Sequence, residues 1–569
     1  MIDDEVKSRV RKLALKNALE HNGKARSDTV VAKVIGLKPE LRKEAKVIFN
    51  QTIGIVDDVN KLGIREQQTE LERTAPEMLV QEEKEEKRAL PPLPNAEMGK
   101  VVTRFPPEPN GYPHIGHAKA IIIDEEYARM YEGKLILRFD DTNPLKEKLE
   151  YYDAIKNGIE WLGVKPHQVK NTSDDMELIY KYGRQMLEID GAYVCTCAGD
   201  SIRENRKNGL GCECMHLDQE NNIARWEKMF NEYTANQAIV RYKGDMKSEN
   251  TVMRDPTLFR IIDGEHPLKG RKYRVWPTYD FAVSIEDSVD GVTHAMRTKE
   301  YELRNELYYA IIDKLQLRKP LMMEFSRLEF DGMPVSKRKI TPLIEQKLVK
   351  SWDDPRLPTL LAMKRRGILP EAIREFVLTL GFTKADTKPP FDALESINRR
   401  MLDPSSRRLF FVPDPVILKV KNAPVKTIKI KNHPDVDMGE REVNVDDTFY
   451  IAGDDAKKMK PGSEVRLIDL YNVKIENVAE KEVVGTYDGD ELRNNPKIQW
   501  VSKNDAVKID VMVPKTLYIG EEYNPASLEI SKGYASTYIS KLKPDEMVQF
   551  VRFGFCRIDS PNVAIQTHR

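Results

Sequence analysis

Cysteine is scarce in this sequence, with 5 among 569 residues, and four of the five fall between positions 195 and 214. Four cysteines so close together in the sequence argue against a disulfide framework and favour a metal site. Long apolar runs are lacking as well: no stretch approaches the roughly 18 residues that span a bilayer, and the first residues lack a signal-peptide pattern. We therefore expect a cytoplasmic protein without a membrane segment.

An excess of charge of one sign is also absent. The 91 basic and 91 acidic side chains cancel, although charged residues make up 32% of the chain. A nucleic-acid partner would therefore have to be bound by local basic patches, because there is no overall basic field to attract it.

The length of 569 residues is too great for one hydrophobic core and indicates several domains. The first 90 or so residues show helical periodicity, as at Val30, Val31 and Val34, and end in a charged segment, Gln81 to Arg88, which we interpret as a solvated helix face. A proline-rich linker follows. From Gly99 strands alternate with helices, which predicts a parallel sheet flanked by helices.

The last part of the chain has a different pattern. Beyond Asn422, short alternating or apolar runs between turn residues predict an all-β region, which we interpret as two small barrels. The clearest predicted strands are Val425 to Ile430, Glu464 to Leu470, Ile509 to Val513 and Gln549 to Phe555. A lysine ribbon in this region could contact an RNA backbone, or it could be an ordinary charged sheet face. It consists of Lys419, Lys421, Lys426, Lys429 and Lys431.

The segment from Arg104 to His117 combines turn residues with two imidazoles three residues apart. A strand precedes it and an apolar-periodic helix, residues 118–131, follows it. The N-terminus of such a helix presents unpaired N–H groups and a positive dipole end to phosphate, and Gly116 would let a ligand approach the backbone. His114 and His117 could donate hydrogen bonds to phosphate oxygens. A loop with ordinary surface histidines is the alternative.

The longer string RFPPEPNGYPHIGHAKA resembles the HIGH signature of class I aminoacyl-tRNA synthetases, in the form of the glutamyl and glutaminyl branch. A cationic loop, PVSKRK, follows a predicted strand at 321–330 and a turn at Asp331 and Gly332. Such a loop can close over a triphosphate and stabilise the departing pyrophosphate. It is similar to the second signature of that family, KMSKS, with Lys337 as the lysine after the serine. Because it departs from the motif at Pro334, Val335 and Arg338, a role for the motif's first lysine is in doubt.

The resemblance implies functional residues at matching positions. The implied catalytic residues are His114, His117 and Lys337. The implied ATP-binding residues are Pro107, His114, Gly116, His117, Ser336, Lys337 and Arg338.

Acidic residues follow the predicted strand at 134–139, where ligands gather in open α/β sheets, and RFDDTNP also resembles the same branch. A helix cap and turn is the alternative. The run from Pro277 to Phe281 is shared by both members of the branch. Eighteen residues after its Tyr279, the glutaminyl type has a small neutral residue and the glutamyl type an arginine, and this chain has Arg297. A guanidinium can pair with a side-chain carboxylate, whereas an amide would leave it poorly paired. The implied glutamate-binding residues are Arg104, Asp140, Tyr279 and Arg297.

Two Cys-x-Cys hooks, Cys195 with Cys197 and Cys212 with Cys214, are separated by fourteen residues. Four thiolates can hold a tetrahedral zinc ion, which would be structural because no coordination position stays open. His216 could replace one of the last two ligands, because one residue separates it from Cys214, as one residue separates the two cysteines of each hook. Four incidental thiols are the alternative.

Taken as a member of this family, the chain would activate glutamate with ATP and Mg²⁺ and transfer it to the terminal ribose of tRNA(Glu), with tRNA(Gln) left open as a second acceptor. A glutamine-specific enzyme and a catalytically inactive tRNA-binding scaffold are the alternatives. The β-rich end suggests an archaeal or eukaryote-like lineage, and a monomer is expected.

The fold class implied is a multidomain one, with a Rossmann-like α/β catalytic domain. Its expected parts are a helical domain and linker at 1–95, the first catalytic half at 96–194, an inserted acceptor-binding subdomain with zinc at 195–270, the second catalytic half with the SKRK loop at 271–344, a helical stem-contact region at 345–415 and anticodon-binding β-barrels at 416–569.

Overall fold

The computed structural model describes residues 4–20, 23–37, 45–75, 90–386 and 388–569. The chain separates into two compact units, Met1–Ala89 and Leu90–Arg569. The charged segment Gln81 to Arg88 lies outside the described residues. Within the described ranges, no helix has both the length and the apolar character needed to cross a bilayer.

The first unit is helical, with a valine-rich core that includes Val30 and Val34. Its Arg11 donates to Glu70 at 2.9 Å and so ties the first helix to the last. The helices are α1 Asp4–Glu20, α2 Ser27–Leu37, α3 Ala45–Lys61 and α4 Ile64–Thr74.

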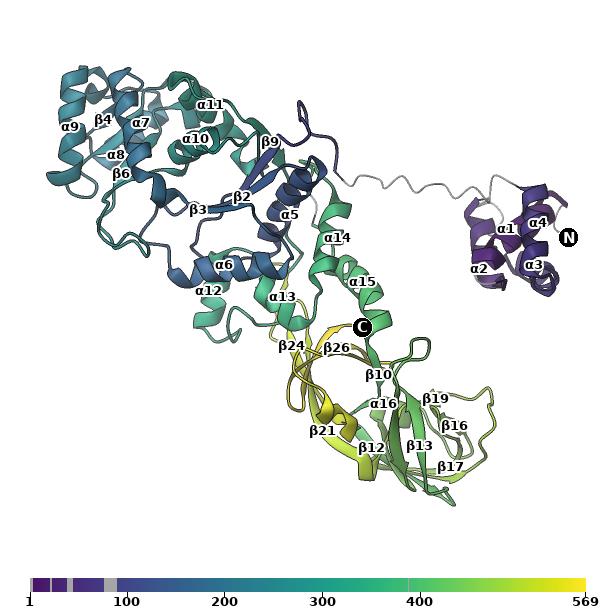
Figure 1. Ribbon diagram of the computed structural model, residues 1–569. Coiled ribbons are helices and arrows are strands. Elements are labelled where there is room, and N and C mark those ends of the chain that lie inside the picture. Colours follow the sequence, from purple (N-terminus) through teal and green to yellow (C-terminus); the bar gives the residue numbers. More distant parts are fainter. Residues whose placement is uncertain (1–3, 21–22, 38–44, 76–89, 387) are drawn as a thin grey trace. The chain divides into compact units, whose positions relative to one another are not determined.

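The second unit begins with a parallel sheet (Figure 1). Strands β1 (Val102–Phe105), β2 (Lys134–Phe139) and β3 (Gln168–Asn171) pair in that order. Strands β8 (His294–Thr298) and β9 (Leu321–Phe325) form a second parallel pair. The Thr293 amide donates to the Val102 carbonyl at 2.9 Å, which brings the start of β8 beside β1. The chain thus extends first to one side of β1 and later to the other, and in such a doubly wound arrangement ligands bind where the order reverses.

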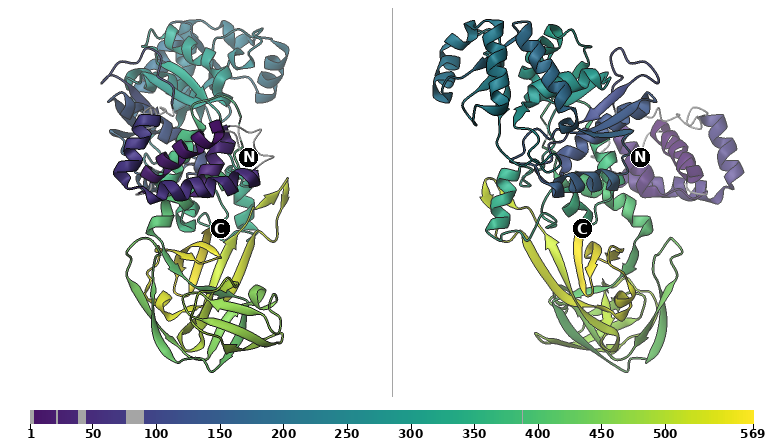
Figure 2. Two further views of the ribbon diagram at one scale, coloured as in Figure 1. Left: turned by 90° about the vertical axis from the view of Figure 1, so that its right-hand side faces the viewer. Right: turned by 60° about the vertical axis from the view of Figure 1, so that its left-hand side comes forward.

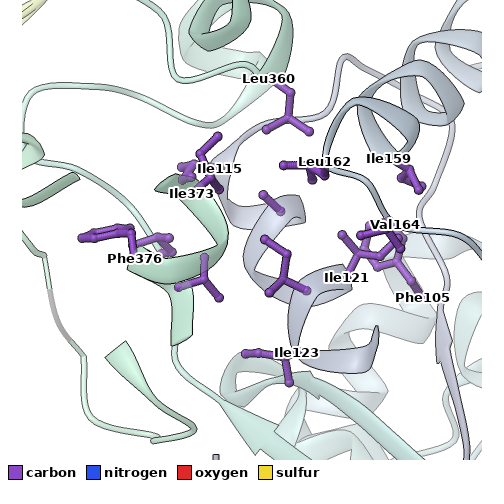
Figure 3. Close-up of a cluster of buried hydrophobic side chains, with 14 of the residues drawn as sticks. Phe105, Ile115, Ile121, Ile123, Ile159, Leu162, Val164, Leu360, Ile373 and Phe376 are labelled. Atoms are coloured by element: carbon purple, nitrogen blue, oxygen red, sulfur yellow. The ribbon is translucent and has the colours of Figure 1, made fainter. Parts of the chain in front are cut away.

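Helix α5 (Ile115–Met130) follows β1 and is buried along most of its length. Figure 3 shows its side chains, among them Ile115 and Ile121, in one apolar cluster with residues of α6 (Leu149–Trp161) and α14 (Pro370–Leu380). Because α5 is packed on several sides, its N-terminus is held firmly against the sheet.

An antiparallel sheet is inserted between the two halves of the parallel one. It orders β4 (Ala192–Cys195), β5 (Ile239–Tyr242), β6 (Thr257–Ile261) and β7 (Val275–Pro277), so it extends slightly beyond residues 195–270 at both ends. Helix α7 (Met176–Glu188) precedes this sheet, and α8 (Gly199–Asn208) and α9 (Gln219–Asn231) lie between its strands β4 and β5 in the sequence. Two more helices follow the sheet, α10 Tyr279–Val289 and α11 Asn305–Lys314.

After β9 come α12 (Lys337–Glu345), α13 (Leu360–Arg366), α14 and α15 (Phe391–Leu402). Two curved seven-stranded sheets follow, drawn green to yellow in Figure 2. One contains β12 Pro415–Lys421, β15 Thr448–Ala452, β16 Glu464–Leu467, β17 Asn472–Val478, β18 Glu482–Tyr487, β19 Lys497–Ile498 and β20 Trp500–Ser502. The other contains β10 Arg407–Leu409, β11 Phe411–Pro413, β21 Ala506–Pro514, β24 Leu528–Ser536, β25 Met547–Phe550, β26 Gly554–Ser560 and β27 Val563–His568. The two sheets are consistent with the expected barrel-like β region.

The order of these strands departs from a simple succession. Strands β10 and β11 precede residue 416 and yet belong to the sheet that the end of the chain completes. The segment from Gln549 to Phe555, predicted as one strand, contains the end of β25, a turn and the start of β26, and the two strands pair antiparallel. The reversal occurs because Arg552 and Gly554 have positive φ values of 62° and 146°.

The lysine ribbon is largely paired within the protein. Lys419 lies 2.6 Å from Glu482 and Lys421 lies 2.7 Å from Glu476. Lys426 and Lys429 also have carboxylate partners within 4 Å. These pairs favour the alternative of an ordinary charged sheet face.

A buried ionic cluster joins β1 and β2 to α10. Asp287 accepts from Arg104 Nε at 3.0 Å and from Arg138 Nη2 at 2.6 Å, and all three side chains are almost fully buried. Burial alone would raise the pKa of Asp287, but the guanidinium groups of Arg104 and Arg138 outweigh it and hold this pKa below the usual aspartate value.

We predict that Asp287→Asn lowers the free energy of unfolding by about 3–5 kcal/mol at neutral pH, because the buried Arg104 loses its carboxylate partner. Arg138 loses one of three, since Glu286 and Asp290 also pair with it. The folded-state pKa lies below the unfolded one, so this contribution is present at neutral pH and is lost as the pH falls through the acidic range. Denaturant unfolding at several pH values measures it. Asp386→Asn is the control, because this carboxylate pairs with Lys299 while 71% exposed. An equal loss in both variants would contradict the prediction.

Candidate functional site

A cavity of about 560 Å³ lies where the order of the parallel strands reverses. His114, Gly116 and His117 contribute to its wall from the start of α5. The remaining lining comes from Ala120 and Val335, from Thr298, Glu300, Tyr301 and Arg304 at and after the end of β8, and from Phe325, Arg327 and Leu328 at and after the end of β9. Three of the residues predicted to bind phosphate therefore share one cavity.

The backbone sets the tautomers of the two histidines. His114 Nδ1 accepts from the Gly116 amide at 3.1 Å, and His117 Nδ1 accepts from the His114 amide at 3.2 Å. Burial, with the His117 ring and Arg327, lowers the pKa of His114 well below its usual value, and burial lowers the pKa of His117 to about 4. Both rings are therefore neutral near pH 7 and carry their hydrogen on Nε2, where it can be donated to a ligand.

Gly116 is required by the histidine before it. A Cβ at this position would lie 2.9 Å from His114 Cε1 and 3.0 Å from Nδ1. Any larger residue would displace the imidazole, so this glycine preserves the ring position as well as access to the backbone.

Lys337 is placed differently from the histidines. It is the first residue of α12, and its Nζ donates to the Asn110 carbonyl at 2.5 Å and lies 4.8 Å from the centre of the Tyr151 ring. Burial, and to a smaller extent Lys148, lowers its pKa. Ser336 precedes it as the helix N-cap, and Arg338 is exposed. Lys337 thus contacts the loop before α5 and is not among the residues that line the cavity.

Pro107 has a structural contact. Its carbonyl accepts from the Asp140 amide at 3.0 Å, so the ends of β1 and β2 are tied together. Burial, reinforced by Glu286 and Glu108, raises the pKa of Asp140 to about 8. A cationic ligand beside this carboxyl would favour its ionised form.

Two buried arginines have unused donors. Arg104 Nη1 donates to the Met296 carbonyl at 2.7 Å, while its Nη2 is buried without a partner among the described residues. Arg297, at the end of β8, donates from Nη2 to Asn305, and its Nε is buried and likewise unpaired within the described chain. An unused buried donor is costly unless a ligand satisfies it.

Tyr279 interacts electrostatically with Arg104, Arg297 and Asp140. Burial raises its pKa, whereas Arg297 and Arg104 act in the opposite direction and Asp140 adds to the rise. Arg104, Asp140 and Arg297 therefore each lie within electrostatic reach of Tyr279. The Tyr279 ring also lies 5.3 Å from the ring of Tyr301, which lines the cavity described above.

Several cavity residues were missed by the sequence interpretation, including Arg327 and Tyr301. Arg327 comes two residues after the end of β9, and Tyr301 three residues after the end of β8. The rule that ligands gather at carboxyl ends of parallel strands was applied to Asp140 and could have indicated both.

The four cysteines of the two hooks converge, with all sulfur atoms within 4.8 Å of one another. Cys195 and Cys212 are 3.8 Å apart, as are Cys197 and Cys214. Tetrahedral zinc with bonds of about 2.3 Å needs sulfur atoms roughly 3.8 Å apart. Arg225 Nη1 lies 3.3 Å from Cys214 Sγ, and Arg241 Nη1 lies 3.7 Å from Cys212 Sγ. His216 is outside this cluster.

The chain matches three family models. Residues 100–404 match the catalytic domain of "tRNA synthetases class I (E and Q)", and residues 406–488 and 497–559 match two anti-codon binding domains of the same group. Similar curated proteins are named glutamate–tRNA ligase. They come from Nitrosopumilus maritimus strain SCM1 (52% identical, 100% of both chains), Cenarchaeum symbiosum strain A (50%, 99% of this chain and 100% of the relative) and Pyrococcus furiosus (41%, 99% and 100%).

Proposed function

The chain belongs to the class I tRNA synthetases for glutamate and glutamine, and on that premise we infer that it is a glutamate–tRNA ligase. Its full length is similar to archaeal enzymes of that name. The observation that carries the choice of glutamate is Arg297, a buried cation with an unused donor and no ion pair among the described residues. A side-chain carboxylate would satisfy it, whereas the amide of glutamine would leave the charge unmatched.

ATP would occupy the cavity at the start of α5. His114 and His117 would donate from Nε2 to phosphate oxygens, and the neutral state of both rings makes that hydrogen available at neutral pH. Magnesium would accompany the triphosphate. Lys337, now bound to the Asn110 carbonyl, would exchange this contact for the phosphates, with Ser336 and Arg338 beside it.

Glutamate would bind beside this cavity. Arg297 would take the side-chain carboxylate, and Asp140 would take the ammonium group, which stabilises the ionised carboxyl. Arg104 Nη2 and Tyr279 would complete the site, with Arg104 held in place by Asp287.

The chemistry needs position and charge stabilisation more than a protein nucleophile. The α-carboxylate of glutamate attacks the α-phosphorus of ATP in line, which gives glutamyl-adenylate and pyrophosphate. The terminal ribose hydroxyl of tRNA(Glu) then takes the glutamyl group and releases AMP.

The inserted sheet would carry a structural zinc ion on Cys195, Cys197, Cys212 and Cys214, at the start of the acceptor-binding part. The sulfur spacing fits a tetrahedral ion, and the nearby Arg225 and Arg241 would offset the negative charge of four thiolates. When bound, the ion would hold the two hooks together and take no part in the reaction.

The first prediction from the proposed function concerns the choice of amino acid. The natural protein should support ATP–pyrophosphate exchange with glutamate, assayed with tRNA present, and should charge tRNA(Glu). Arg297→Ser should lower kcat/KM for glutamate about 10- to 100-fold, because a charge-assisted hydrogen bond is worth about 1.5–3 kcal/mol. Robust use of glutamine by the natural protein would instead indicate a glutaminyl enzyme, and no exchange at all would indicate an inactive scaffold.

The second prediction concerns Lys337. Lys337→Ala should abolish most pyrophosphate exchange, because the cation that stabilises the leaving group is lost, and should keep tRNA binding in a filter assay. Lys350→Ala, at another exposed lysine, is the matched control. Unchanged exchange in the Lys337 variant would refute its role.

The third prediction concerns the metal. The purified protein should contain about one zinc ion per chain by elemental analysis, and Cys197→Ser should lose most of it. Cys556→Ser should keep the zinc, because Cys556 lies in β26, outside the cluster of four sulfur atoms. If the natural protein contains no zinc, and takes up none when it is refolded in the presence of zinc, the four thiols are incidental.

A further inference from the structure

Arg297 is held by a neutral amide although a carboxylate lies just beyond it. Arg297 and Glu324 are register partners on the parallel strands β8 and β9. Asn305, the first residue of α11, stands between their side chains: its Oδ1 accepts from Arg297 Nη2, and its Nδ2 donates to Glu324 Oε1. A guanidinium can only donate and a carboxylate can only accept, so an amide can satisfy both groups while it keeps them apart.

The charge of Glu324 is compensated elsewhere. Glu324 is 8% exposed, and its Oε2 lies 3.1 Å from Lys384 Nζ. Lys384 also lies 2.8 Å from Glu302. Lys384 therefore pairs with the Glu324 oxygen that Asn305 does not contact. The amide of Asn305 keeps its oxygen toward Arg297 because a guanidinium cannot accept a hydrogen bond and a carboxylate cannot donate one.

The other neighbours of Arg297 orient it without neutralising it. Its guanidinium carbon lies 5.5 Å from the centre of the Tyr308 ring and 6.0 Å from that of Tyr301. Aromatic faces attract a cation and carry no formal charge. The guanidinium is thus fixed in position, and among the described residues no carboxylate lies within ion-pair distance of it. Asp280 feels its charge, but that carboxylate is paired with Arg304.

We propose that Asn305 is a specificity-determining positioning residue, which insulates Arg297 from Glu324 and so keeps the guanidinium available for the side-chain carboxylate of glutamate. This proposal rests on the proposed function, since it assumes that Arg297 meets that carboxylate. A carboxylate at position 305 would pair with Arg297 in the free enzyme, and glutamate would have to displace it. Glutamine, which gains less from the cation, would lose less.

The first test is Asn305→Asp, measured by ATP–pyrophosphate exchange with tRNA present. We expect KM for glutamate to rise at least tenfold and KM for ATP to stay unchanged. The ratio of kcat/KM for glutamate to that for glutamine should fall. Asn231→Asp makes the same chemical change at the exposed end of α9 and should leave all three quantities unchanged.

A charge swap separates insulation from simple structural support. Asn305→Asp places two carboxylates side by side, and this repulsion could itself destabilise the fold. The double variant Asn305→Asp/Glu324→Gln removes the repulsion and restores the natural net charge and shape, but leaves the carboxylate directly on Arg297. Its melting temperature should return toward that of the natural protein, while KM for glutamate should stay at least tenfold raised.

The outcomes are distinct. A double variant with the natural KM for glutamate and the natural preference over glutamine would overturn the proposal, because shape and net charge would then suffice. If the single variant does not fold, the double variant alone decides. Natural protein that shows no exchange with glutamate would refute the proposed function, whereas active natural protein with insensitive variants would refute the role of Asn305 alone.

Discussion

The catalytic part of this protein depends on how buried guanidinium groups are paired. A buried cation without a partner is costly, and a buried cation with a carboxylate is electrostatically satisfied. Arg104 and Arg138 share Asp287, which ties two strands of the parallel sheet to α10. Arg297 makes no direct ion pair with a carboxylate in the described residues and is held by Asn305. The same side-chain type therefore serves the fold in one place and is kept ready for a ligand in another.

The surroundings of the two histidines also set their charge state, but these rings are neutral, whereas the guanidinium groups are charged. His114 and His117 are half-buried at the start of α5, and the loss of solvent around them lowers their pKa values and keeps the rings neutral. Backbone amides occupy both Nδ1 atoms, so both Nε2 hydrogens remain for a ligand. Neutral donors are suited to a transition state whose charge grows on the phosphates, because they need no proton transfer to act.

The inserted sheet is connected by a buried contact to the acidic loop that we propose to bind the amino acid. His266 Nε2 lies 3.1 Å from Glu147 Oε2 and 3.0 Å from the Asp141 carbonyl, and the imidazole stacks on Trp276. Asp141 in turn accepts from Ser173 and Tyr152. The acidic loop that contains Asp140 is thus held in place by several elements.

The sequence by itself determined the local elements and the family. Periodicity and turn residues located β2, α5 and the β-rich end, and the two signatures and the hooks identified a class I synthetase, because these features depend on neighbours along the chain. It did not reveal Asp287 or Asn305, nor the turn that divides Gln549 to Phe555. Those depend on contacts between residues far apart in sequence: Asp287 meets Arg104 across 183 positions, and the Asn305 amide meets its two partners because β8, β9 and α11 converge. Whether a buried charge has a partner is a property of three-dimensional packing, and tertiary structure alone decided it.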